Sequence, residues 1–226
     1  MKFPSSWLKG NSLGEFIACE LRLQIINGTI QHGTVLSENR IAAEFSASRS
    51  PVREALKTLS SEGLITLQRM GAIVNGLKVK DIEELYDVRY LIESFSWRRL
   101  AATDPTPIIA KLHQIVDKME LAAKYRDVVE FAYQDLTFHE HIITAANHAR
   151  LMHLWSSIRP IVMTVMLITT EEVLSEGEAK INYVVEKHRK LLKELQSQNP
   201  AVIAAGIEEY FADSINTVHT SMKETK

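Results

Sequence analysis

Asp135 and His139 stand four residues apart in the segment QDLTFHEHI, and their side chains are suited to bind a cation. Residues four apart lie on one face of a helix, so a carboxylate and an imidazole at this spacing can reach a single divalent metal ion. A partly buried Asp–His ion pair without a metal has the same spacing. The spacing alone therefore leaves both interpretations open and favours the simpler ion pair.

A second chemical signal is the basic start of the helix predicted within SASRSPVREALKTLSSEGLI, residues 46–65. Pro51 suits a first helical turn, and a serine before it suits the N-cap, so the helix is predicted to start near Ser50. Arg49 and Arg53 then share one face, beside the serine hydroxyls and without acidic neighbours. Arginine forks and short hydroxyls fit phosphate oxygens and guanine edges. An ordinary solvated face is the alternative, and the neighbouring elements must decide.

The elements around this helix predict a winged helix-turn-helix. Apolar periodicity predicts a helix from Ser12 to Ile26, stopped by Asn27-Gly28, and another that starts at Ser37 as its N-cap. Ser46-Ala47-Ser48 is the tight turn before the third helix. Beta signals are confined to residues 35–36, 65–69 and 72–76, with a turn around Met70-Gly71. In this order of elements, the helix after the tight turn enters the DNA major groove.

The remainder of the chain is predicted to be helical. Leu77 to Lys80 resembles a short linker, and the expected helices cover residues 81–102, 107–124, 126–146, 148–170, 176–197 and 201–222. The predicted fold is mainly α: an N-terminal winged helix-turn-helix with a small β-hairpin wing over residues 1–77, then an all-helical antiparallel bundle over residues 78–226. A bundle of this size is large enough for an interior ligand site.

Composition narrows the class of protein. The 226 residues include 46% hydrophobic residues and one cysteine, Cys19, which favours a globular protein and excludes an internal disulfide framework. Neither a signal peptide nor a membrane span is expected, so the predicted location is cytoplasmic. Residues 1–80 carry ten Lys and Arg against six Asp and Glu, whereas residues 81–226 carry sixteen against twenty-two. A basic first half favours a polyanionic partner.

These motifs resemble the GntR family of bacterial transcription regulators. The resemblance of the first half lies in LSENRIAAEFSASRSPVREALKTLSSEGLITLQRMGAIV. The helical half, through DIEELYDVRYLIES, QDLTFHEHI and EKHRKLLKELQ, is similar to the effector-binding domain of the FadR subfamily. The resemblance covers nearly the full chain. It implies a homodimer that binds double-stranded operator DNA and responds to a small-molecule effector.

The resemblance also implies which residues contact DNA. They lie in the second predicted helix, at the start of the third and at the wing: Arg40, Ser48, Arg49, Ser50, Arg53, Arg69 and Gly71. One of Arg49 and Arg53 is expected to read a guanine and the other to hold a phosphate. Gly71 allows a close backbone approach at the hairpin tip. For Arg40, an ion pair with Glu44 is the alternative.

In the helical half, the resemblance extends the Asp135–His139 pair. Metal-binding relatives take further ligands from a histidine opening an H-R-x-L-L helix, which is His188 here, and from a histidine 22 residues further on. Tyr210 occupies that last position, and tyrosine is a rare ligand at such sites. The expected metal ligands are Asp135, His139 and His188, holding zinc or a similar divalent ion weakly or not at all.

The expected effector site adds Arg89 and Asn147 to this cluster. Arg89 lies among apolar residues, and a guanidinium there needs an anion, either Glu93 or the carboxylate of a ligand. Asn147 most simply caps its helix, but the matching family position borders the cavity. The predicted effector contacts are Arg89, Asp135, His139, Asn147, His188 and Tyr210, the last through a hydrogen bond to a polyhydroxylated ligand.

Two functions are compatible with these residues. The first is a transcription factor, a repressor of a sugar-acid utilisation operon that is released by gluconate or a related carboxylate. The second is a metal-dependent enzyme in which two histidines and one carboxylate hold a catalytic ion. The winged domain favours the regulator, because an enzyme has no need of it.

Overall fold

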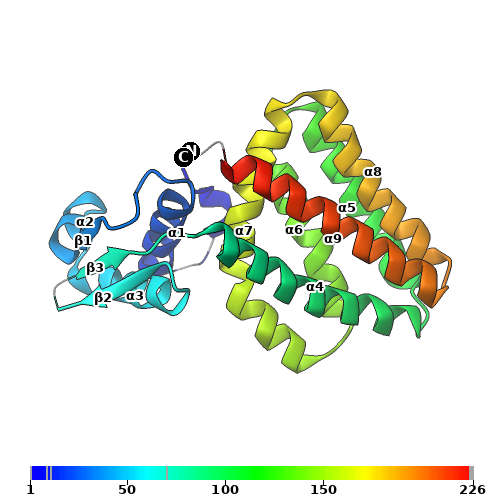
Figure 1. Cartoon of the computed structure of the whole chain (residues 1–226), viewed down its shortest axis with the longest axis horizontal. Coiled ribbons are helices and arrows are strands. Elements are labelled where there is room, and N and C mark those ends of the chain that lie inside the picture. Colours follow the sequence, from blue (N-terminus) through cyan, green and yellow to red (C-terminus); the bar gives the residue numbers. More distant parts are fainter. Residues whose placement is uncertain (1, 9, 11, 70, 224–226) are drawn as a thin grey trace. The chain divides into compact units, whose positions relative to one another are not determined.

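The first long helix shows how closely local sequence sets the element boundaries. In the computed structural model, which describes all residues except 1, 9, 11, 70 and 224–226, this helix is α1 (Leu13–Ile26) (Figure 1). The Ser12 hydroxyl accepts from the Glu15 N–H, and the Glu15 carboxylate accepts from the Ser12 N–H. This capping box satisfies two donors at the helix start. Asn27 caps the other end and Gly28 follows with φ 77°, which confirms the predicted stop.

The buried residues of α1 are not confined to a single apolar stripe. Ile17, Leu21 and Leu23 are fully or nearly fully buried, and so is Arg22 in their midst. The Arg22 guanidinium donates to both oxygens of Glu62, at 2.7 and 2.6 Å. This bidentate pair compensates the cost of burying the charge. Hydrophobic periodicity has no signal for such a pair, because its two members are 40 residues apart.

The predicted winged helix-turn-helix is present. A 3-10 helix, η1 (Ser5–Leu8), precedes α1, and the remaining elements of the motif are β1 (Val35–Ser37), α2 (Glu38–Glu44), α3 (Arg49–Ser61), β2 (Ile65–Gln68) and β3 (Gly71–Val74). The strands form an antiparallel sheet in the order β1-β3-β2, in which Val35 pairs with Ile73 and Ile65 with Val74. The β2–β3 hairpin is the predicted wing. Of its predicted turn, Met70 lies outside the described residues.

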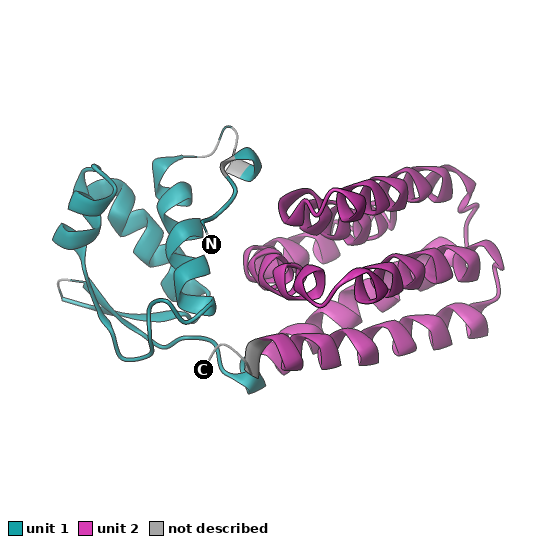
Figure 2. Cartoon of the chain, turned by 90° about the horizontal axis from the view of Figure 1, so that it is seen from above, with its two compact units in different colours: residues 1–81, 225–226 teal, residues 82–224 magenta. Residues whose placement is uncertain are grey.

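The second half of the chain is helical, as predicted. Its described helices are α4 (Val79–Ala101), α5 (Thr106–Lys124), α6 (Val128–Ala145), α7 (Ala149–Ser175), α8 (Glu178–Gln196) and α9 (Pro200–Lys223). The chain divides into two units, residues up to Asp81 and residues from Ile82, shown in separate colours in Figure 2. The main difference from the predicted boundaries is α7, which continues five residues past the expected end at 170.

The core of the second unit is built from large side chains on α4, α6 and α7. Trp97, Phe131, Phe138 and Trp155 are at most 1% exposed. Burial of such side chains supplies about 1.5–3 kcal/mol each, the dominant favourable term in folding. This packing fixes the facing surfaces of the helices that carry the polar cluster described below.

No membrane span was expected, but α7 is a long and apolar helix. By length and composition alone it could cross a membrane: its most apolar 18-residue window has a mean hydropathy of 1.5. Of that window, 44% is buried inside the protein, and α7 packs against α6, α8 and α9. Packing in the bundle therefore accounts for part of the apolar character of α7.

Candidate functional site

The start of α3 is exposed and basic, as the sequence predicted. Val52, Leu56 and Leu59 are buried, whereas Arg49 and Arg53 are exposed. Ser48 is the N-cap residue by its extended backbone, yet its hydroxyl makes no capping hydrogen bond. The helix start thus combines backbone N–H groups without a side-chain cap, the Ser48 hydroxyl and basic side chains at its positive end. Such an arrangement suits phosphate oxygens.

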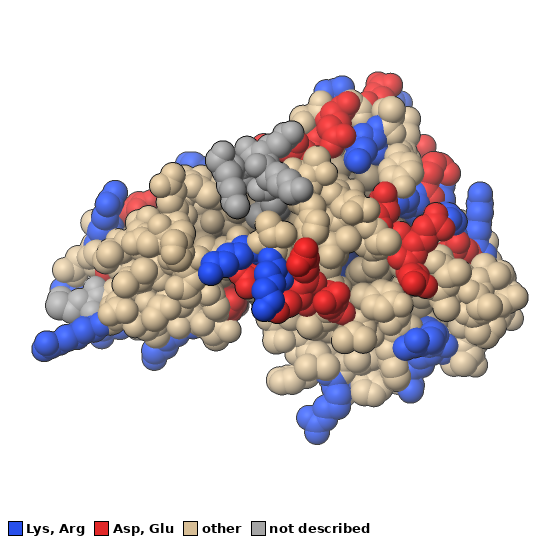
Figure 3. All heavy atoms as spheres, viewed as in Figure 1, with Lys and Arg blue, Asp and Glu red and all other residues tan. Residues whose placement is uncertain are grey.

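The first unit carries further exposed basic residues. Arg40 on α2 and Arg69 after β2 are exposed, and no ion pair joins Arg40 to Glu44 among the described residues. The Nε of Arg53 donates to Glu38 at 3.0 Å, with the arginine side chain 59% exposed. Lys and Arg side chains project from the part of this unit that carries α2 and the β2–β3 hairpin (Figure 3). Ser50 is exposed beside them.

Gly71 has a structural role that the sequence did not indicate. Its φ of 150° and its buried position in β3 place a Cβ, if there were one, 2.0 Å from the carbonyl oxygen of Leu36. Only glycine fits there without moving the β1–β3 pairing. The need for glycine at this position is therefore explained inside the sheet, and a DNA contact is not required to explain it.

In the second unit, α4, α6, α8 and α9 bring together a buried polar cluster. Nδ1 of His139 donates to Glu93 Oε2 at 2.5 Å, and Nδ1 of His188 donates to the Val184 carbonyl at 2.8 Å. Both imidazoles are 0% exposed. Asp135 Oδ1 lies 3.4 Å from Nε2 of His139 and 3.0 Å from Nε2 of His188.

These contacts test whether the residues fit a metal ion. A neutral imidazole has one N–H, so a histidine that donates through Nδ1 directs a lone pair from Nε2. Two such lone pairs and the Asp135 oxygen converge, and the three ligand atoms lie within 4.8 Å of one another. The Glu93 and Val184 oxygens hold the rings as outer partners of metal-bound histidines do. Asp135, His139 and His188 therefore fit a divalent ion such as zinc.

Tyr210 lies at the position where a fourth ligand is expected. Its hydroxyl is 2.8 Å from Nε2 of His139 and 3.4 Å from Nε2 of His188. Burial, with the nearby Asp135 charge, raises the pKa of Tyr210 well above its ordinary value of 10. The phenol therefore stays protonated and acts as a hydrogen-bond donor rather than as a metal ligand.

The charges of the cluster depend on one another. Burial raises the pKa of Asp135 and of Glu93, but the neighbouring histidines and, for Glu93, Arg89 outweigh this and hold both values below the ordinary range. Burial lowers the pKa of His139, but Glu93 above all, with Asp135, raises it above its ordinary 6.5. Both carboxylates are thus ionised, and a positive charge among them is favoured.

Beside the cluster lies a small cavity of about 50 Å³, to which Arg89 contributes. Nε of Arg89 donates to Glu93 Oε1 at 2.6 Å, so the anion expected for this arginine is present in the chain. Its Nη2 is nevertheless buried without a hydrogen-bond partner among the described residues. The other polar residues that line the cavity come from five helices: Tyr86, Asp135, Thr169, Thr170, Lys187, Tyr210, Ser214 and Thr217.

One predicted effector-binding residue, Asn147, belongs neither to the polar cluster nor to the cavity wall. Asn147 is exposed, with φ 47°, directly after the Ala146 cap of α6, and it is not part of the cavity wall. Asparagine tolerates this left-handed conformation, which suits a residue that ends a helix, and its effector contact stays a prediction that this cavity does not support. His139 and His188 are also not on the cavity wall, and they meet it through Asp135 and Tyr210.

Sequence reasoning missed several residues of this site. Glu93 was considered only as a partner of Arg89, whereas it also orients His139. Its i, i+4 spacing to Arg89 was a visible signal. The hydroxyls of Thr169, Thr170 and Ser214 carried no signal, because threonine and serine are common in helices for many reasons.

Comparisons with known proteins agree with this division into a DNA-binding and a helical unit. Residues 13–74 match the bacterial regulatory proteins of the gntR family, and residues 84–213 match the FCD domain. The chain belongs to the GntR family. This GntR-family chain is therefore a transcription regulator, and the alternative of a metal-dependent enzyme is set aside.

Two relatives extend over nearly the whole of this GntR-family chain. It is 41% identical over 211 residues to the gluconate operon transcriptional repressor of Bacillus subtilis (strain 168), and 39% identical to that of Bacillus licheniformis. Each alignment covers 93% of this chain and 87% of the relative. Among solved structures, Escherichia coli McbR/YncC is similar in fold, with a TM-score of 0.68 and 19% identity over 92% of this chain and 98% of that one.

Proposed function

We propose that this regulator represses a gluconate or related sugar-acid utilisation operon and is released from its operator by a small sugar acid. The observation that carries the proposal is the identity of about 40% to two gluconate operon repressors, which spans both the DNA-binding and the helical unit. A relative similar in the operator-binding unit alone would say little about the effector. Similarity over the helical unit makes the same effector class the simplest inference.

The chemistry of the cavity supports a sugar acid as effector. The unpaired Nη2 of Arg89 is a buried donor that a carboxylate would satisfy. The hydroxyls of Thr169, Thr170 and Ser214 suit the hydroxyls of a polyol chain, because each can donate or accept. The Tyr210 hydroxyl, on the side of the histidines, can accept a hydrogen bond from an effector hydroxyl. Cation, hydroxyls and a small volume together disfavour a large apolar ligand.

A divalent metal ion is the cofactor that we propose for the cluster of Asp135, His139 and His188. When bound, it would supply a positive charge for effector oxygens in its open coordination positions. The chain's own contribution is to orient the two imidazoles through Glu93 and Val184. Because Tyr210 does not coordinate, we expect the metal to be bound more weakly than in a site with four protein ligands.

For the operator, we propose contacts from the exposed groups around the start of α3. Arg49 and Arg53 would enter the major groove with Ser48 and Ser50, while Arg40 and Arg69 would hold phosphates on either side. Arg53 must exchange its partner Glu38 for DNA to do so. Gly71 would contribute only through the shape of the wing. A regulator that binds operator DNA acts in the cytoplasm, which is the proposed location.

We also propose that the regulator is a homodimer joined through α4 and α7. Val88, Leu91 and Phe95 on α4 are exposed, at a spacing that places them on one helix face. Leu154 of α7 is exposed as well, and the Phe95 ring meets the ring of His148 at the start of α7. Apolar residues gathered on one exposed face mark an interaction surface. A second copy is the natural partner, because operators are commonly palindromic.

In this proposal, α4 links the effector to the dimer. Arg89 faces the cavity, while Val88 and Leu91 next to it face outward. An effector that engages Arg89 would favour a different placement of α4 and hence a different arrangement of the DNA-binding units in the dimer. Release of DNA then follows from the difference in effector affinity between the two arrangements.

A gel-shift experiment tests the proposed function. The full-length protein is mixed with DNA from upstream of its own gene, and gluconate is added at increasing concentration in the presence of zinc. We expect a specific complex that gluconate dissociates and that an equal concentration of glucose, which lacks the carboxylate, leaves intact. A complex that no sugar acid dissociates would refute the assignment of the effector.

A further inference from the structure

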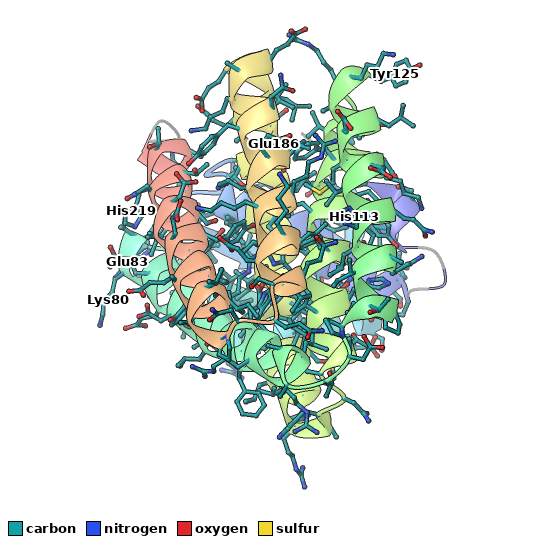
Figure 4. The ribbon with its side chains drawn as sticks, turned by 90° about the vertical axis from the view of Figure 1, so that its right-hand side faces the viewer. Lys80, Glu83, His113, Tyr125, Glu186 and His219 are labelled. Carbon is teal, nitrogen blue, oxygen red and sulfur yellow. The ribbon has the colours of Figure 1, made fainter. Side chains whose placement is uncertain are left out.

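Two hollows of the helical unit meet at the same two side chains. One is the cavity beside Arg89, and the other is a groove of about 170 Å³ between α8 and α9. Their walls share Lys187 and Tyr210. Figure 4 shows α8 and α9 side by side at the surface of the bundle, with Glu186, which lines the groove, labelled on α8. Lys187 and Tyr210 therefore form the partition between an outer groove and the inner cavity.

The two partition residues differ in how firmly they are held. Tyr210 is fixed from the inner side by its hydrogen bonds to His139 and His188. Lys187 points its ammonium group to Asp213, with which it forms an ion pair, and lies over the Tyr210 ring at 5.1 Å. Its side chain is 14% exposed, and that of Asp213 is 32% exposed. A flexible lysine stem with a half-exposed partner is the part of the partition that can move.

Asp213 has a second partner that would remain if Lys187 left. The Tyr183 hydroxyl donates to Asp213 Oδ1 at 3.0 Å, while Lys187 contacts Oδ2. Burial raises the pKa of Asp213, but the hydrogen bonds from Lys187 and Tyr183 hold it below its ordinary value. The carboxylate therefore stays ionised, partly exposed and hydrogen-bonded, so that the departure of Lys187 leaves no buried unpaired charge.

The size of the cavity requires such a movement. A volume of about 50 Å³ accommodates a few water molecules, whereas a six-carbon sugar acid needs several times more. Additional volume lies in the groove on the other side of Lys187. We expect that movement of this one side chain out of the partition would join the two spaces.

We propose that Lys187 is a partner-switching anion clamp: it leaves Asp213, opens the α8–α9 groove to the cavity, and binds the effector carboxylate together with Arg89. The proposal rests on the proposed function, since it deepens the site of the sugar acid. It accounts for a lysine on the wall of both hollows. Arg89 is already paired with Glu93, so an added carboxylate needs a second cation beside it. Lys187 supplies that cation.

The test is a thermodynamic cycle on full-length protein at a fixed zinc concentration, with gluconate binding measured by isothermal titration calorimetry. Lys187→Gln should weaken gluconate binding by about tenfold or more, through loss of one charge contact. Asp213→Asn should strengthen binding by about two- to fivefold, because Lys187 no longer has to leave an ion pair. In the Lys187→Gln background, Asp213→Asn should have no such effect.

Arg189 and Glu120 provide a control. They form an ion pair between α8 and α5, at 2.6 Å, and line neither the groove nor the cavity. Glu120→Gln, which breaks this pair, should bind gluconate as the wild type does. If the Lys187–Asp213 pair only held the helices together, Asp213→Asn would weaken binding or leave it unchanged, and either result overturns the clamp.

Different experimental results would refute the proposed clamp and the proposed function. A wild-type protein that binds no gluconate overturns both. A wild-type protein that binds gluconate and is released from DNA by it, with Lys187→Gln binding equally well, overturns the clamp alone. Thermal unfolding of each variant establishes that the folded state is retained, and Lys187→Met serves as a second neutral variant of similar length.

Discussion

Tyr210 is the residue that decides whether the metal cluster has three protein ligands or four. Its hydroxyl, which burial keeps protonated, lies 2.8 Å from Nε2 of His139, the atom that a metal ion would use. Tyr210→His replaces this hydroxyl with a lone pair and should tighten zinc binding by about tenfold or more, about 1.4 kcal/mol. Titration of chelator-stripped protein with zinc measures the change.

Tyr210→Phe is the control for this prediction. It removes the hydroxyl but adds no ligand, so zinc affinity should stay within a small factor of the wild type. Tight stoichiometric zinc in the wild-type protein, unchanged in both variants, would mean that the three ligands and water complete the site without regard to this position. His188→Ala should abolish both metal binding and the response to the effector.

The cluster also predicts how the stability of the metal-free helical unit depends on pH. The pKa values of Asp135 and Glu93 lie below their ordinary 3.8 and 4.5, so their stabilising effect is present above those values and is lost as the pH falls. The pKa of His139 lies above its ordinary 6.5, so its effect is complete below 6.5 and is lost as the pH rises through its folded value. Stability should therefore be greatest between about pH 4.5 and 6.5.

Thermal unfolding of chelator-stripped protein from pH 4 to 9 measures this dependence. His139→Gln should lose the decline on the alkaline side, because its amide does not titrate. His113→Gln, a change of an exposed histidine on α5, should keep the decline. A wild-type stability that rises steadily from pH 6 to 8 would show that His139 is neutral in the folded protein.

Among the elements, α3 carries the most direct prediction about DNA. Arg49→Ala and Arg53→Ala should each weaken operator binding without unfolding the protein, because both side chains are exposed. Loss of a base-reading arginine should cost about 1–3 kcal/mol and relax specificity at one base pair, whereas loss of a phosphate contact should weaken all sequences alike. Fluorescence anisotropy on operator and scrambled DNA separates the two.

Arg53 has a second partner that sharpens this comparison. Since it pairs with Glu38 in the absence of DNA, Glu38→Gln should free it and modestly strengthen DNA binding. Lys111→Ala removes the same charge from an exposed position in the helical unit and should have little effect. Unchanged affinity in both arginine variants would remove α3 from the groove.

The elements also show what sequence patterns can and cannot predict. Caps and apolar periods predicted helices near their observed positions, since Ser12, Asn27 and Pro51 act through local backbone chemistry. The surroundings of α1 were missed, because the ion pair of Arg22 with Glu62 joins residues far apart in sequence. The predicted end of α7 at residue 170 was too early. No glycine or proline stands there to stop the helix, which continues to Ser175, shortly before Gly177.

At the scale of the molecule, only part of the candidate site could be predicted from the sequence. The Asp135–His139 spacing was visible, and His188 followed from a family resemblance. The addition of Glu93 from α4 and of the cavity hydroxyls from α7 and α9 required the packing of the bundle. Long-range convergence of this kind is decided by which helix faces pack together, and no local pattern specifies it.

The assembly of two chains gives the last prediction. Leu91 is 65% exposed at the centre of the α4 face formed with Val88 and Phe95. Leu91→Glu would place a charge in an apolar interface, where it costs several kcal/mol unless paired, and should dissociate the dimer. Leu121 on α5 is similarly exposed, at 55%, but is distant in sequence from this face, and Leu121→Glu should leave the dimer intact.

Light scattering and sedimentation at micromolar concentration distinguish these outcomes. If Leu91→Glu is a monomer, it should also bind a palindromic operator weakly, because one winged unit contacts only half of the site. Conditions that restore the dimer should restore tight binding. Fold retention is checked by zinc binding at Asp135, His139 and His188, which lie within one chain. A wild-type monomer, or a Leu91→Glu dimer that is as stable as the wild type, would show that the exposed α4 face is not the dimer interface and contacts another partner. The effector would then not act through the arrangement of subunits at this face.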